Sequence, residues 1–377
     1  MRTEAVVDLD AVRRNVEVLC EHAAGGARVL AVVKADGYGH GLVPTARAAV
    51  AGGAAWLGVA FLEEALALRA AGLDGPVLAW LFAPEEDLRP AVAAGVDLGI
   101  YSVAELAAAA EAAQATGVQA RLHLKADTGL SRGGAQPADW PDLCEAAAKA
   151  EADGQVKVTG LWSHFAFADG GPDHPTNSRQ TGVFREATEV ADRAGLRPEV
   201  RHLANSAATL TAPATHFDLV RPGLAVYGLS PVPHLGDPAA FGLRPAMTLR
   251  STVALTKSVP AGSGVSYLHR YVTERATRLA LVPLGYADGV PRNATNVAQV
   301  QVGGVRRTIA GTVCMDQFVL DVGDDRVSAG DEVVLFGPGD GGEPTAQEWA
   351  DVLGTINYEI VTRLGARVPR TYVGGTS

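Results

Sequence analysis

The stretch RVLAVVKADGYGHG, residues 28–41, indicates how the rest of the chain is organised. Its apolar first half predicts a buried strand, and the three glycines that follow predict a loop. Lys34 lies where the strand ends, and a lysine in apolar surroundings is costly unless it is paired, solvated or used in chemistry. A simple solvent-exposed strand end is the commoner explanation for a single lysine. The nearby glycines, which let backbone approach a ligand, and the Tyr38 hydroxyl favour a functional site.

Composition narrows the class of protein. The chain has 377 residues, which predicts two domains, and 47% hydrophobic with 20% charged residues is typical of a globular protein. A net charge of -10 without a basic tract argues against a nucleic-acid partner. Cys20, Cys144 and Cys314 form neither a disulfide framework nor a metal-ligand spacing. With no signal peptide and no apolar run of membrane-spanning length visible, we expect a cytoplasmic protein with no membrane partner.

Short apolar runs alternate with alanine-rich stretches over the first two-thirds of the chain. The predicted strands are 29–35, 56–60, 76–81, 97–102, 120–127, 158–165, 199–206 and 219–228. The intervening predicted helices include 62–72, 104–117, 142–154 and 178–195, each ending in glycine. Eight strands alternating with helices predict an α/β fold, a (β/α)8 TIM-type barrel. An open doubly wound sheet is the alternative, but its G-x-G-x-x-G fingerprint does not follow the first strand.

The alternation of strand and helix patterns stops in the proline- and glycine-rich stretch 231–242, and alternating β patterns follow it. A single late helix is expected around 345–353. We therefore predict a barrel domain over residues 1–238 and a mainly β domain over residues 239–377. For the first ten or so residues, packing on the second domain is left open.

Polar residues cluster where the predicted barrel strands end, which is where barrel enzymes carry their catalytic groups. They are Lys34, Lys125, Arg132, Ser163, His164, Asn205, Ser206 and Arg221. Each has a structural explanation when taken alone, such as a core histidine or an ordinary ion pair. Together they favour a site in which a lysine forms a Schiff base with pyridoxal 5'-phosphate, with Ser206 opening a helix beside the phosphate.

The sequence resembles the alanine racemase family at this point. AVVKADGYGHG (31–41) is similar to the family's cofactor-attachment motif, and further family blocks follow in order along the whole chain. They are HLKADTGLSRGG, HLANSAATL, RPGLAVYG, VSY, PLGYADGVPR, GTVCMDQ and INYEIVTR. The resemblance implies a barrel followed by a β domain, alanine as the substrate, and a homodimer in which the partner's second domain completes each active site.

The resemblance also implies a role for individual residues. Lys34 would hold pyridoxal 5'-phosphate and exchange the D-alanine proton, while Tyr267 from the partner chain would exchange the L-alanine proton. Cofactor contacts would come from Tyr38, His164, Asn205, Ser206, Arg221, Gly223, Leu224 and Tyr358. Substrate contacts would come from Arg132, Met315 and Asp316. The channel entrance would be formed by Asp169, Tyr286 and Arg292. Lys125 matches a lysine that is carbamylated in many members.

Three features bear on the substrate range. Leu268 follows Tyr267 where many family members have glycine, and Trp162 and Phe167 are bulkier than usual. The leading hypothesis is racemisation of L- and D-alanine, which supplies D-alanine for peptidoglycan. The alternatives are a broader amino-acid racemase, acting for example on serine, and a non-catalytic pyridoxal-phosphate carrier, which the β domain with Tyr267 argues against. Whether its role is biosynthetic or catabolic is left open.

Overall fold

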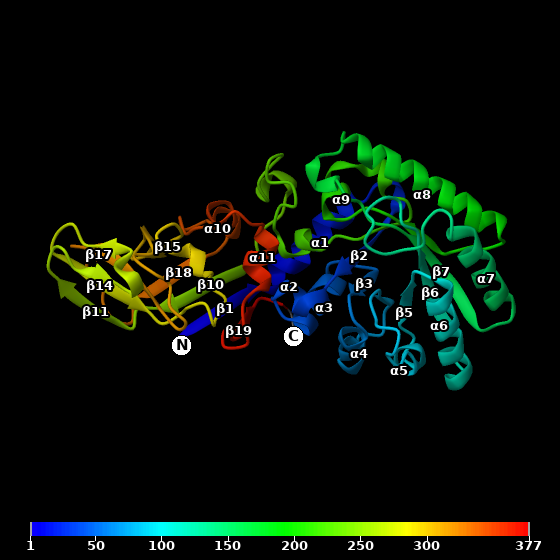
Figure 1. Cartoon of the computed structure of the whole chain (residues 1–377), viewed down its shortest axis with the longest axis horizontal. Helices are drawn as coiled ribbons and strands as arrows, with labels where there is room; N and C mark the ends of the chain where they lie inside the picture. The colour runs from blue at the N-terminus through cyan, green and yellow to red at the C-terminus, as the bar shows by residue number, and fades with distance from the viewer. Residues whose placement is uncertain (1, 376–377) are drawn as a thin grey trace. The chain divides into compact units, whose positions relative to one another are not determined.

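The computed structural model describes residues 2–375, which form two compact units (Figure 1). One unit comprises Val12–Gly37 and Leu42–Leu243. The other comprises the residues up to Ala11, Tyr38–Gly41 and the chain from Arg244 onward. The predicted domain limits, 1–238 and 239–377, stay a prediction at the level of single residues. Within residues 2–375, the helices all lack the length and apolar character needed to cross a membrane.

An eight-stranded parallel barrel with helices around it forms the first unit. The strands are β2 (Arg28–Val32), β3 (Trp56–Val59), β4 (Val77–Ala79), β5 (Asp97–Ile100), β6 (Ala120–Lys125), β7 (Val156–Trp162), β8 (Val200–His202) and β9 (Leu219–Val220). They are hydrogen-bonded in the order β8-β7-β6-β5-β4-β3-β2-β9. Backbone hydrogen bonds from Asp218 N to Arg201 O (3.0 Å) and from Arg221 N to Ala204 O (2.9 Å) join the two end segments. This closure confirms the TIM-type prediction and excludes the open sheet.

Helices follow the barrel strands, as the alanine-rich stretches predict. They are α1 (Leu9–His22), α2 (Lys34–Tyr38), α3 (Leu42–Ala51), α4 (Leu62–Ala70), α5 (Arg89–Ala93), α6 (Val103–Thr116), α7 (Trp140–Ala152), α8 (Pro175–Arg193) and α9 (Ser206–Thr211). Gly72, Gly117, Gly154 and Gly195 all have positive φ just after a helix, as expected of helix-terminating glycines. Because the helices cover the strands, the strands are buried on both faces and read as continuous apolar runs.

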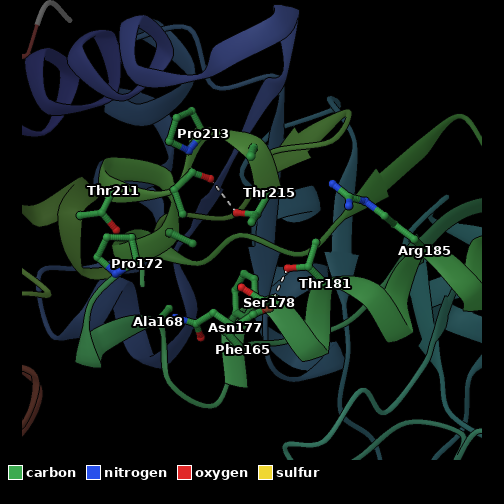
Figure 2. Close-up of a pocket in the computed structure, with 13 residues that line it drawn as sticks. Phe165, Ala168, Pro172, Asn177, Ser178, Thr181, Arg185, Thr211, Pro213 and Thr215 are labelled. Atoms are coloured by element: carbon green, nitrogen blue, oxygen red, sulfur yellow. Dashed lines mark hydrogen bonds between the residues drawn. The ribbon is translucent and has the colours of Figure 1, made fainter. Parts of the chain in front are cut away.

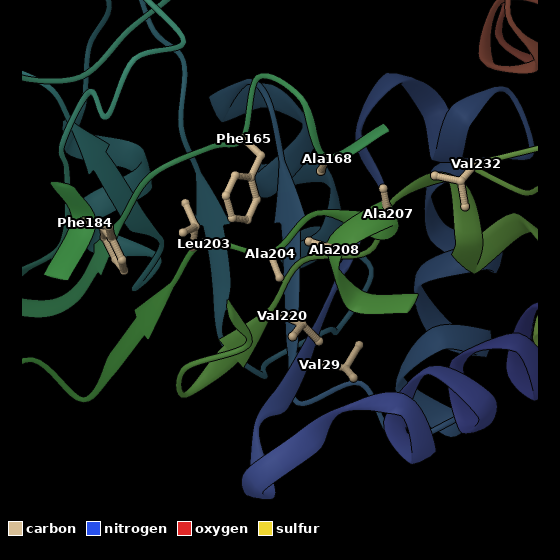
Figure 3. Close-up of a cluster of buried hydrophobic side chains, with 10 residues drawn as sticks. All are labelled: Val29, Phe165, Ala168, Phe184, Leu203, Ala204, Ala207, Ala208, Val220 and Val232. Carbon is tan, nitrogen blue, oxygen red and sulfur yellow. The ribbon is translucent and has the colours of Figure 1, made fainter. Parts of the chain in front are cut away.

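One buried cluster shows how sheet and helices pack (Figure 3). Val29 of β2 and Val220 of β9 lie in the same apolar cluster as Ala207 and Ala208 of α9, together with Phe165. All five are at most 4% exposed, and burying such side chains is the main favourable contribution to folding. The cluster fixes α9 against the two strands that precede Lys34 and Arg221.

The second unit is mainly β. A six-stranded sheet has the order β16-β15-β18-β10-β1-β19, and β11-β14-β17 and β12-β13 form smaller sheets. The bounds are β1 (Thr3–Asp8), β10 (Met247–Thr252), β11 (Leu255–Val259), β12 (Gly264–Val265), β13 (Tyr271–Val272), β14 (Thr277–Val282), β15 (Gln299–Val302), β16 (Val305–Thr308), β17 (Phe318–Gly323), β18 (Glu332–Phe336) and β19 (Arg370–Val373). Strand β1 lies between β10 and β19 in this unit.

Two helices belong to the same β-rich unit, α10 (Ala346–Leu353) and α11 (Asn357–Thr362). The first confirms the helix predicted around 345–353, but the prediction of a single late helix is wrong, because α11 follows it. It begins at a capping box, in which the Thr345 hydroxyl accepts from Glu348 N and the Glu348 carboxylate accepts from Thr345 N.

All eight predicted barrel strands end earlier than their apolar patterns suggest, and two of them bear directly on the site. The run 219–228 is a strand only over Leu219–Val220, and Leu224–Tyr227 is a short 3-10 helix. Arg221 therefore follows its strand, whereas the sequence pattern placed it near the beginning. The run 29–35 likewise ends at Val32, and Lys34 begins a separate turn. In both places a glycine or proline shortly afterwards allows the chain to leave the sheet, which apolar periodicity cannot show.

Candidate active site

Lys34 begins a left-handed helical turn at the end of β2. Ala35 (φ 54°, ψ 50°), Asp36 (φ 53°, ψ 49°) and Gly37 (φ 60°, ψ 43°) all have left-handed dihedral angles. For residues with a Cβ, this conformation costs about 1–2 kcal/mol each. Hydrogen bonds offset the cost: Ala35 N donates to the Glu64 carboxylate (2.6 Å) and Leu42 N to that of Asp36 (2.8 Å). At Gly37 a Cβ would lie 2.5 Å from Thr45 Oγ1, so glycine is required there for space as well.

The Lys34 amine lies in a partly buried and positively charged environment. Burial lowers its pKa, the nearby Arg132 lowers it further, and the Glu64 carboxylate acts in the opposite direction. Its Nζ lies 5.9 Å from the centroid of the Trp80 ring. A lysine with a lowered pKa has more neutral amine at a given pH, and only the neutral amine is a nucleophile or a base.

Lys125 is buried, which argues against a surface ion pair with Asp127 as its explanation. It is 4% exposed at the end of β6, and its Nζ lies 4.8 Å from the Tyr101 ring centroid and 4.6 Å from that of Trp162. Burial first, and then Arg132 and Arg221, lower its pKa to about 8. The neighbouring Asp127 is held by backbone N–H groups of its own loop, including Gly129 N (2.9 Å) and Leu130 N (3.0 Å).

Arg221 is buried among neutral acceptors. Its Nη2 donates to the backbone oxygens of Ser163 (2.7 Å) and Leu203 (3.2 Å) and contacts His164 Nδ1 at 3.2 Å. Its Cζ lies 5.0 Å from the centroid of Trp162. Burial lowers the pKa of the guanidinium, and no carboxylate hydrogen-bonds to it among residues 2–375. A buried cation surrounded by neutral groups is suited to a ligand acceptor or an anion.

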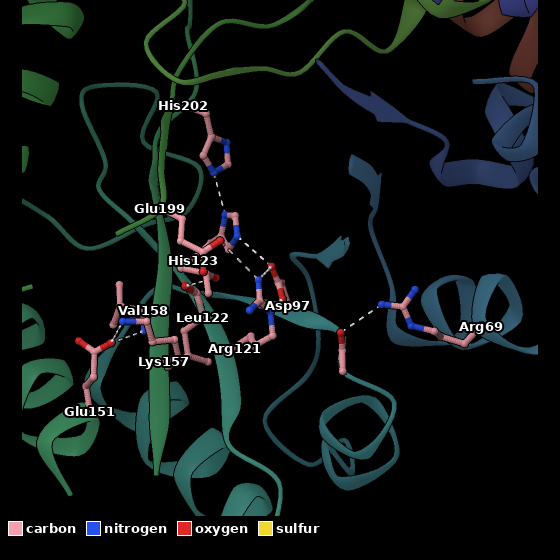
Figure 4. Close-up of polar contacts among 12 residues, drawn as sticks. Arg69, Asp97, Arg121, Leu122, His123, Glu151, Lys157, Val158, Glu199 and His202 are labelled. Atoms are coloured by element: carbon pink, nitrogen blue, oxygen red, sulfur yellow. Dashed lines mark hydrogen bonds and ion pairs between the residues drawn. The ribbon is translucent and has the colours of Figure 1, made fainter. Parts of the chain in front are cut away.

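A line of hydrogen bonds runs from Arg221 through the barrel interior, where Arg221 Nη1 contacts His202 Nδ1 at 3.0 Å. Figure 4 shows the line from His202 onward, in which His202 Nε2 contacts His123 Nδ1 at 2.8 Å. His123 Nε2 in turn contacts the Asp97 carboxylate at 3.2 Å. Arginine can only donate and a carboxylate can only accept, so both neutral imidazoles must carry their proton on Nε2. Burial, followed by Arg221, lowers the pKa of His202 and keeps it neutral.

The pKa of His164 depends on burial and on the cations around it. Its pKa is lowered first by burial and then by Arg221, Arg132, Lys125 and Lys34. These four cations therefore lie close enough to act on one imidazole, as the strand-end pattern predicts. The neutral ring can accept a hydrogen bond from Arg221 at Nδ1 and leaves Nε2 for its proton.

Ser206 and Gly223 meet beside this group of cations. The Ser206 hydroxyl oxygen accepts from Gly223 N (2.8 Å) and from Ala225 N (3.4 Å), which leaves the hydroxyl proton available to a ligand. Leu224 begins the 3-10 helix after Gly223. Asn205 caps α9 by accepting from Ala208 N (3.0 Å), and its side chain also hydrogen-bonds to Asp169.

The remaining candidates lie in the β-rich unit. Tyr38 and Tyr358 have ring centroids 6.2 Å apart, and burial raises the pKa of Tyr38. Tyr267 is 68% exposed at the start of a 3-10 turn whose flanking Ser266, Leu268 and His269 all have positive φ. Its backbone oxygen accepts from the Thr312 hydroxyl at 2.8 Å.

Three predicted residues of this unit lie near Cys314, namely Tyr286, Met315 and Asp316. Tyr286 N donates to Cys314 O (3.0 Å), next to the exposed Met315. Asp316 accepts from Arg367 at 2.7 Å. Arg292 is exposed at the beginning of a separate short 3-10 helix, Arg292–Ala294.

The sequence pattern did not identify the roles of six residues of the barrel group. They are Glu64, Trp80, Tyr101, His123, Trp162 and His202. A signal existed for His123, because it lies two residues before Lys125 and a strand points such residues to the same side. The other contacts are between strands far apart in sequence. No local pattern shows them.

Together, the closed barrel, the lysine that follows its first strand and the buried cations are typical of a barrel enzyme whose site lies at the strand ends. The chain matches the sequence model of the alanine racemase N-terminal domain over residues 7–231 and that of the alanine racemase C-terminal domain over residues 246–372. The chain therefore belongs to the alanine racemase family, whose members are isomerases.

Individual relatives agree over the full length. The chain is 67% identical over 373 residues to an alanine racemase of Frankia casuarinae, covering 99% of this chain and 97% of that protein. It is 63% identical over 374 residues to one of Salinispora tropica, covering 99% of each. The crystal structure of alanine racemase from Streptomyces lavendulae superposes with a TM-score of 0.98 at 56% identity, covering 100% of this chain and 98% of that chain.

Proposed function

We propose that this protein racemises L- and D-alanine with pyridoxal 5'-phosphate, using Lys34 and Tyr267 as its two bases. The observation that supports this most directly is the pairing of a partly buried, pKa-lowered Lys34 with a buried Arg221 that has only neutral partners. These residues fit a cofactor that offers an aldehyde, a ring nitrogen and a phosphate. When bound, the cofactor withdraws electrons from the substrate Cα and makes its proton acidic.

Lys34 would hold the cofactor and exchange a proton on one face of the substrate. A neutral amine at its Nζ is needed both to join the cofactor and to accept the D-alanine proton. Burial and Arg132 favour that neutral form. Removal of a proton from one face and return of a proton to the other require a second group opposite Lys34, which is the role proposed for Tyr267.

Arg221 and Ser206 would hold the two ends of the cofactor. Arg221 would donate to the ring nitrogen but would not readily give up its proton. The neutral imidazoles of His202 and His123 and the Asp97 carboxylate behind it fix its position through the contacts at 3.0, 2.8 and 3.2 Å. The free Ser206 hydroxyl proton would bind the phosphate, with Gly223, Leu224 and Asn205 beside it and Tyr38 and Tyr358 as further contacts.

The surroundings of Lys125 support carbamylation. The modification joins the neutral amine nitrogen to the carbon of CO2 and releases one proton. A pKa of about 8 provides neutral amine near physiological pH. The negative carbamate would then lie beside Arg132 and Arg221, which disfavour a positive charge at this position. It would hold Arg132 toward the substrate carboxylate, with Met315 and Asp316 as further substrate contacts.

We further propose a homodimer, in which Tyr267 works in the barrel of the partner chain. The exposed surface around it supports this: Tyr267 is 68%, Leu268 76% and Met315 52% exposed. Apolar side chains gathered in this way mark interaction surfaces. Tyr286, Arg292 and Asp169 would narrow the entrance to a small side chain. We also propose that the protein is cytoplasmic and that it supplies D-alanine for peptidoglycan.

Complementation between two inactive variants tests the shared site. Lys34→Ala and Tyr267→Phe chains would each be inactive as homodimers. After joint refolding, random pairing makes half of the dimers mixed, and each mixed dimer has one intact site, so about one quarter of wild-type activity returns. If both bases came from the same chain, mixing would restore nothing. Turnover of alanine and serine in the same assay separates an alanine racemase from one of broader range.

A further inference from the structure

A cavity of about 370 Å³ lies in the barrel unit, and none of the assigned site residues is among those that line it. Its walls come from α8 on one side, from the segment Thr211–Thr215 on the other, and from the loop between β7 and α8 (Figure 2). The volume is within the range of small-molecule sites. The proposed function makes no use of this cavity.

The cavity carries one unbalanced positive charge. Arg185 is the only ionisable side chain among its lining residues, so no carboxylate lies in the wall. Within residues 2–375, the Arg185 guanidinium takes part in neither an ion pair nor a hydrogen bond. A guanidinium offers five donors in a planar arrangement suited to a carboxylate. This end of the cavity is therefore complementary to an anion.

Four further polar residues of the wall offer hydrogen-bond acceptors. Thr181, Thr211 and Thr215 each donate their hydroxyl proton to a backbone oxygen at 2.8 Å, so only their lone pairs remain for a ligand. Asn177 uses its amide hydrogens on Phe167 O (3.3 Å) and Gly171 O (2.9 Å). Its Oδ1 is buried without a donor, in a residue only 7% exposed. Such unsatisfied acceptors favour a positively charged donor.

The two ends of the cavity can be told apart in Figure 2. Arg185 lies to the right of the other lining residues, and Pro172 and Thr211 lie to the left. Between them, Phe165, Ala168 and Pro213 supply apolar surface. A single amino acid has its two charges on one carbon, whereas a dipeptide separates them by one residue length and carries side chains between them.

We propose that this cavity binds a zwitterionic dipeptide with an apolar side chain. Its carboxylate binds Arg185, its ammonium group lies near Thr211 and Asn177, and its side chain contacts Phe165 and Pro213.

Occupancy would act on the active site through the loop that forms one wall, an effect that rests on the proposed function. Phe165 directly follows His164, whose Nδ1 contacts Arg221 at 3.2 Å. Ala168 directly precedes Asp169, which is bonded to Asn205, the cap of α9. A dipeptide that fixes Phe165 and Ala168 would restrict the entrance residue Asp169. We expect KM for alanine to change while kcat stays nearly constant.

Calorimetric titration of the holoenzyme tests binding without reference to activity. The probe is L-alanyl-L-leucine, with its C-terminal amide and its N-acetyl derivative as analogues that each lack one charge. Wild type should bind the dipeptide, and either analogue should bind about tenfold more weakly or worse, because each loses a charged hydrogen bond. Arg185→Met should weaken binding similarly, and Ala214→Tyr, which adds a ring at an exposed position of the wall, should abolish it.

The matched control is Arg193→Met, which removes an exposed arginine from the same helix outside the cavity and should leave binding unchanged. Circular dichroism verifies that each variant is folded. Absence of wild-type binding, equal binding by Arg185→Met, or binding that Ala214→Tyr leaves intact would each overturn the proposal. These binding results do not test the proposed function, which is tested separately by racemase activity without dipeptide.

Discussion

The two proposed bases occupy opposite environments. Lys34 is partly buried on a barrel, where burial and the nearby Arg132 lower its pKa and the Trp80 ring lies 5.9 Å from its Nζ. Tyr267 is 68% exposed, on a turn with three residues of positive φ around it. Lys34 thus acquires its chemical character within its own unit. The surface around Tyr267 remains exposed in the single chain.

This difference indicates how the work of a two-base site is divided. A strand end in a closed barrel receives neighbours from many strands, so one chain can tune a lysine there. A turn at the edge of a small sheet has few neighbours within its own chain, and in the proposed dimer it would obtain them from the partner. Substitutions at Lys34 should therefore act within one subunit, and substitutions at Tyr267 across two.

The largest effect is expected for Lys34→Ala. Racemisation should fall by ~10⁴-fold or more, because the change removes a general acid–base group together with the point of cofactor attachment. Borohydride reduction followed by mass spectrometry should find no cofactor linked to the chain. Lys257→Ala, at an exposed lysine of β11, is the control and should retain both activity and linkage. Labelling of another lysine in the wild type would refute the assignment.

Tyr267→Phe should reduce kcat by about 10²–10³-fold, within the usual contribution of one general acid–base group. Because Tyr267 does not hold the cofactor, the visible absorbance of the bound cofactor should stay unchanged. Tyr271→Phe makes the same chemical change four residues later, where the hydroxyl binds Asp321 at 2.7 Å, and should retain activity. Unchanged racemisation by Tyr267→Phe would show that the second base lies elsewhere.

Two glycines, Gly160 in the unit of Lys34 and Gly264 in the unit of Tyr267, allow the packing of the two units to be compared. A Cβ at Gly160 would lie 2.2 Å from His123 Nδ1, and one at Gly264 would lie 2.3 Å from the His269 ring. His123 is fully buried and held by two hydrogen bonds, so Gly160→Ala should cost about 1–3 kcal/mol of unfolding free energy. The exposed His269 can turn away, so Gly264→Ala should cost less than about 0.5 kcal/mol. Urea denaturation measures both, and equal costs would remove the contrast.

The smallest effect concerns the pKa of Lys34. Capture of the cofactor by the apoenzyme should accelerate as pH rises and Lys34 loses its proton, with a midpoint below the ordinary lysine value of about 10.4. The Glu64 carboxylate raises this pKa by stabilising the charged amine, so Glu64→Gln should move the midpoint to lower pH. Glu63→Gln, at the exposed neighbouring residue, should leave it in place. A midpoint that moves upward in Glu64→Gln would contradict the electrostatic account.

Local sequence was sufficient for much of the fold. Strands buried on both faces have apolar sequences, and many of the helices have alanine-rich sequences that end in glycine. The barrel and the helix at 345–353 could therefore be predicted. The ends of strands were less predictable. Apolar character continues past Val32 and Val220 although the hydrogen-bonded strand stops there, because side-chain burial and sheet pairing are separate properties.

The site divides in the same way. The polar residues at strand ends could be identified in advance, since parallel strands deliver their ends to one mouth. The aromatic contacts of Lys125 and the histidine line behind Arg221 could not, because Tyr101, His123, Trp162 and His202 come from different strands. Their proximity depends on the order and closure of the sheet.

The sequence by itself thus determined the family, the barrel and the residue types that carry the chemistry, because these are written in local periodicity and in motifs. Only the tertiary structure decided their state. Lys34 and Lys125 have lowered pKa values, and Arg221 lies buried among neutral partners, because burial and charge depend on neighbours distant in sequence. The exposed Tyr267 is the clearest case, since the local periodicity around it does not indicate whether its own chain covers it.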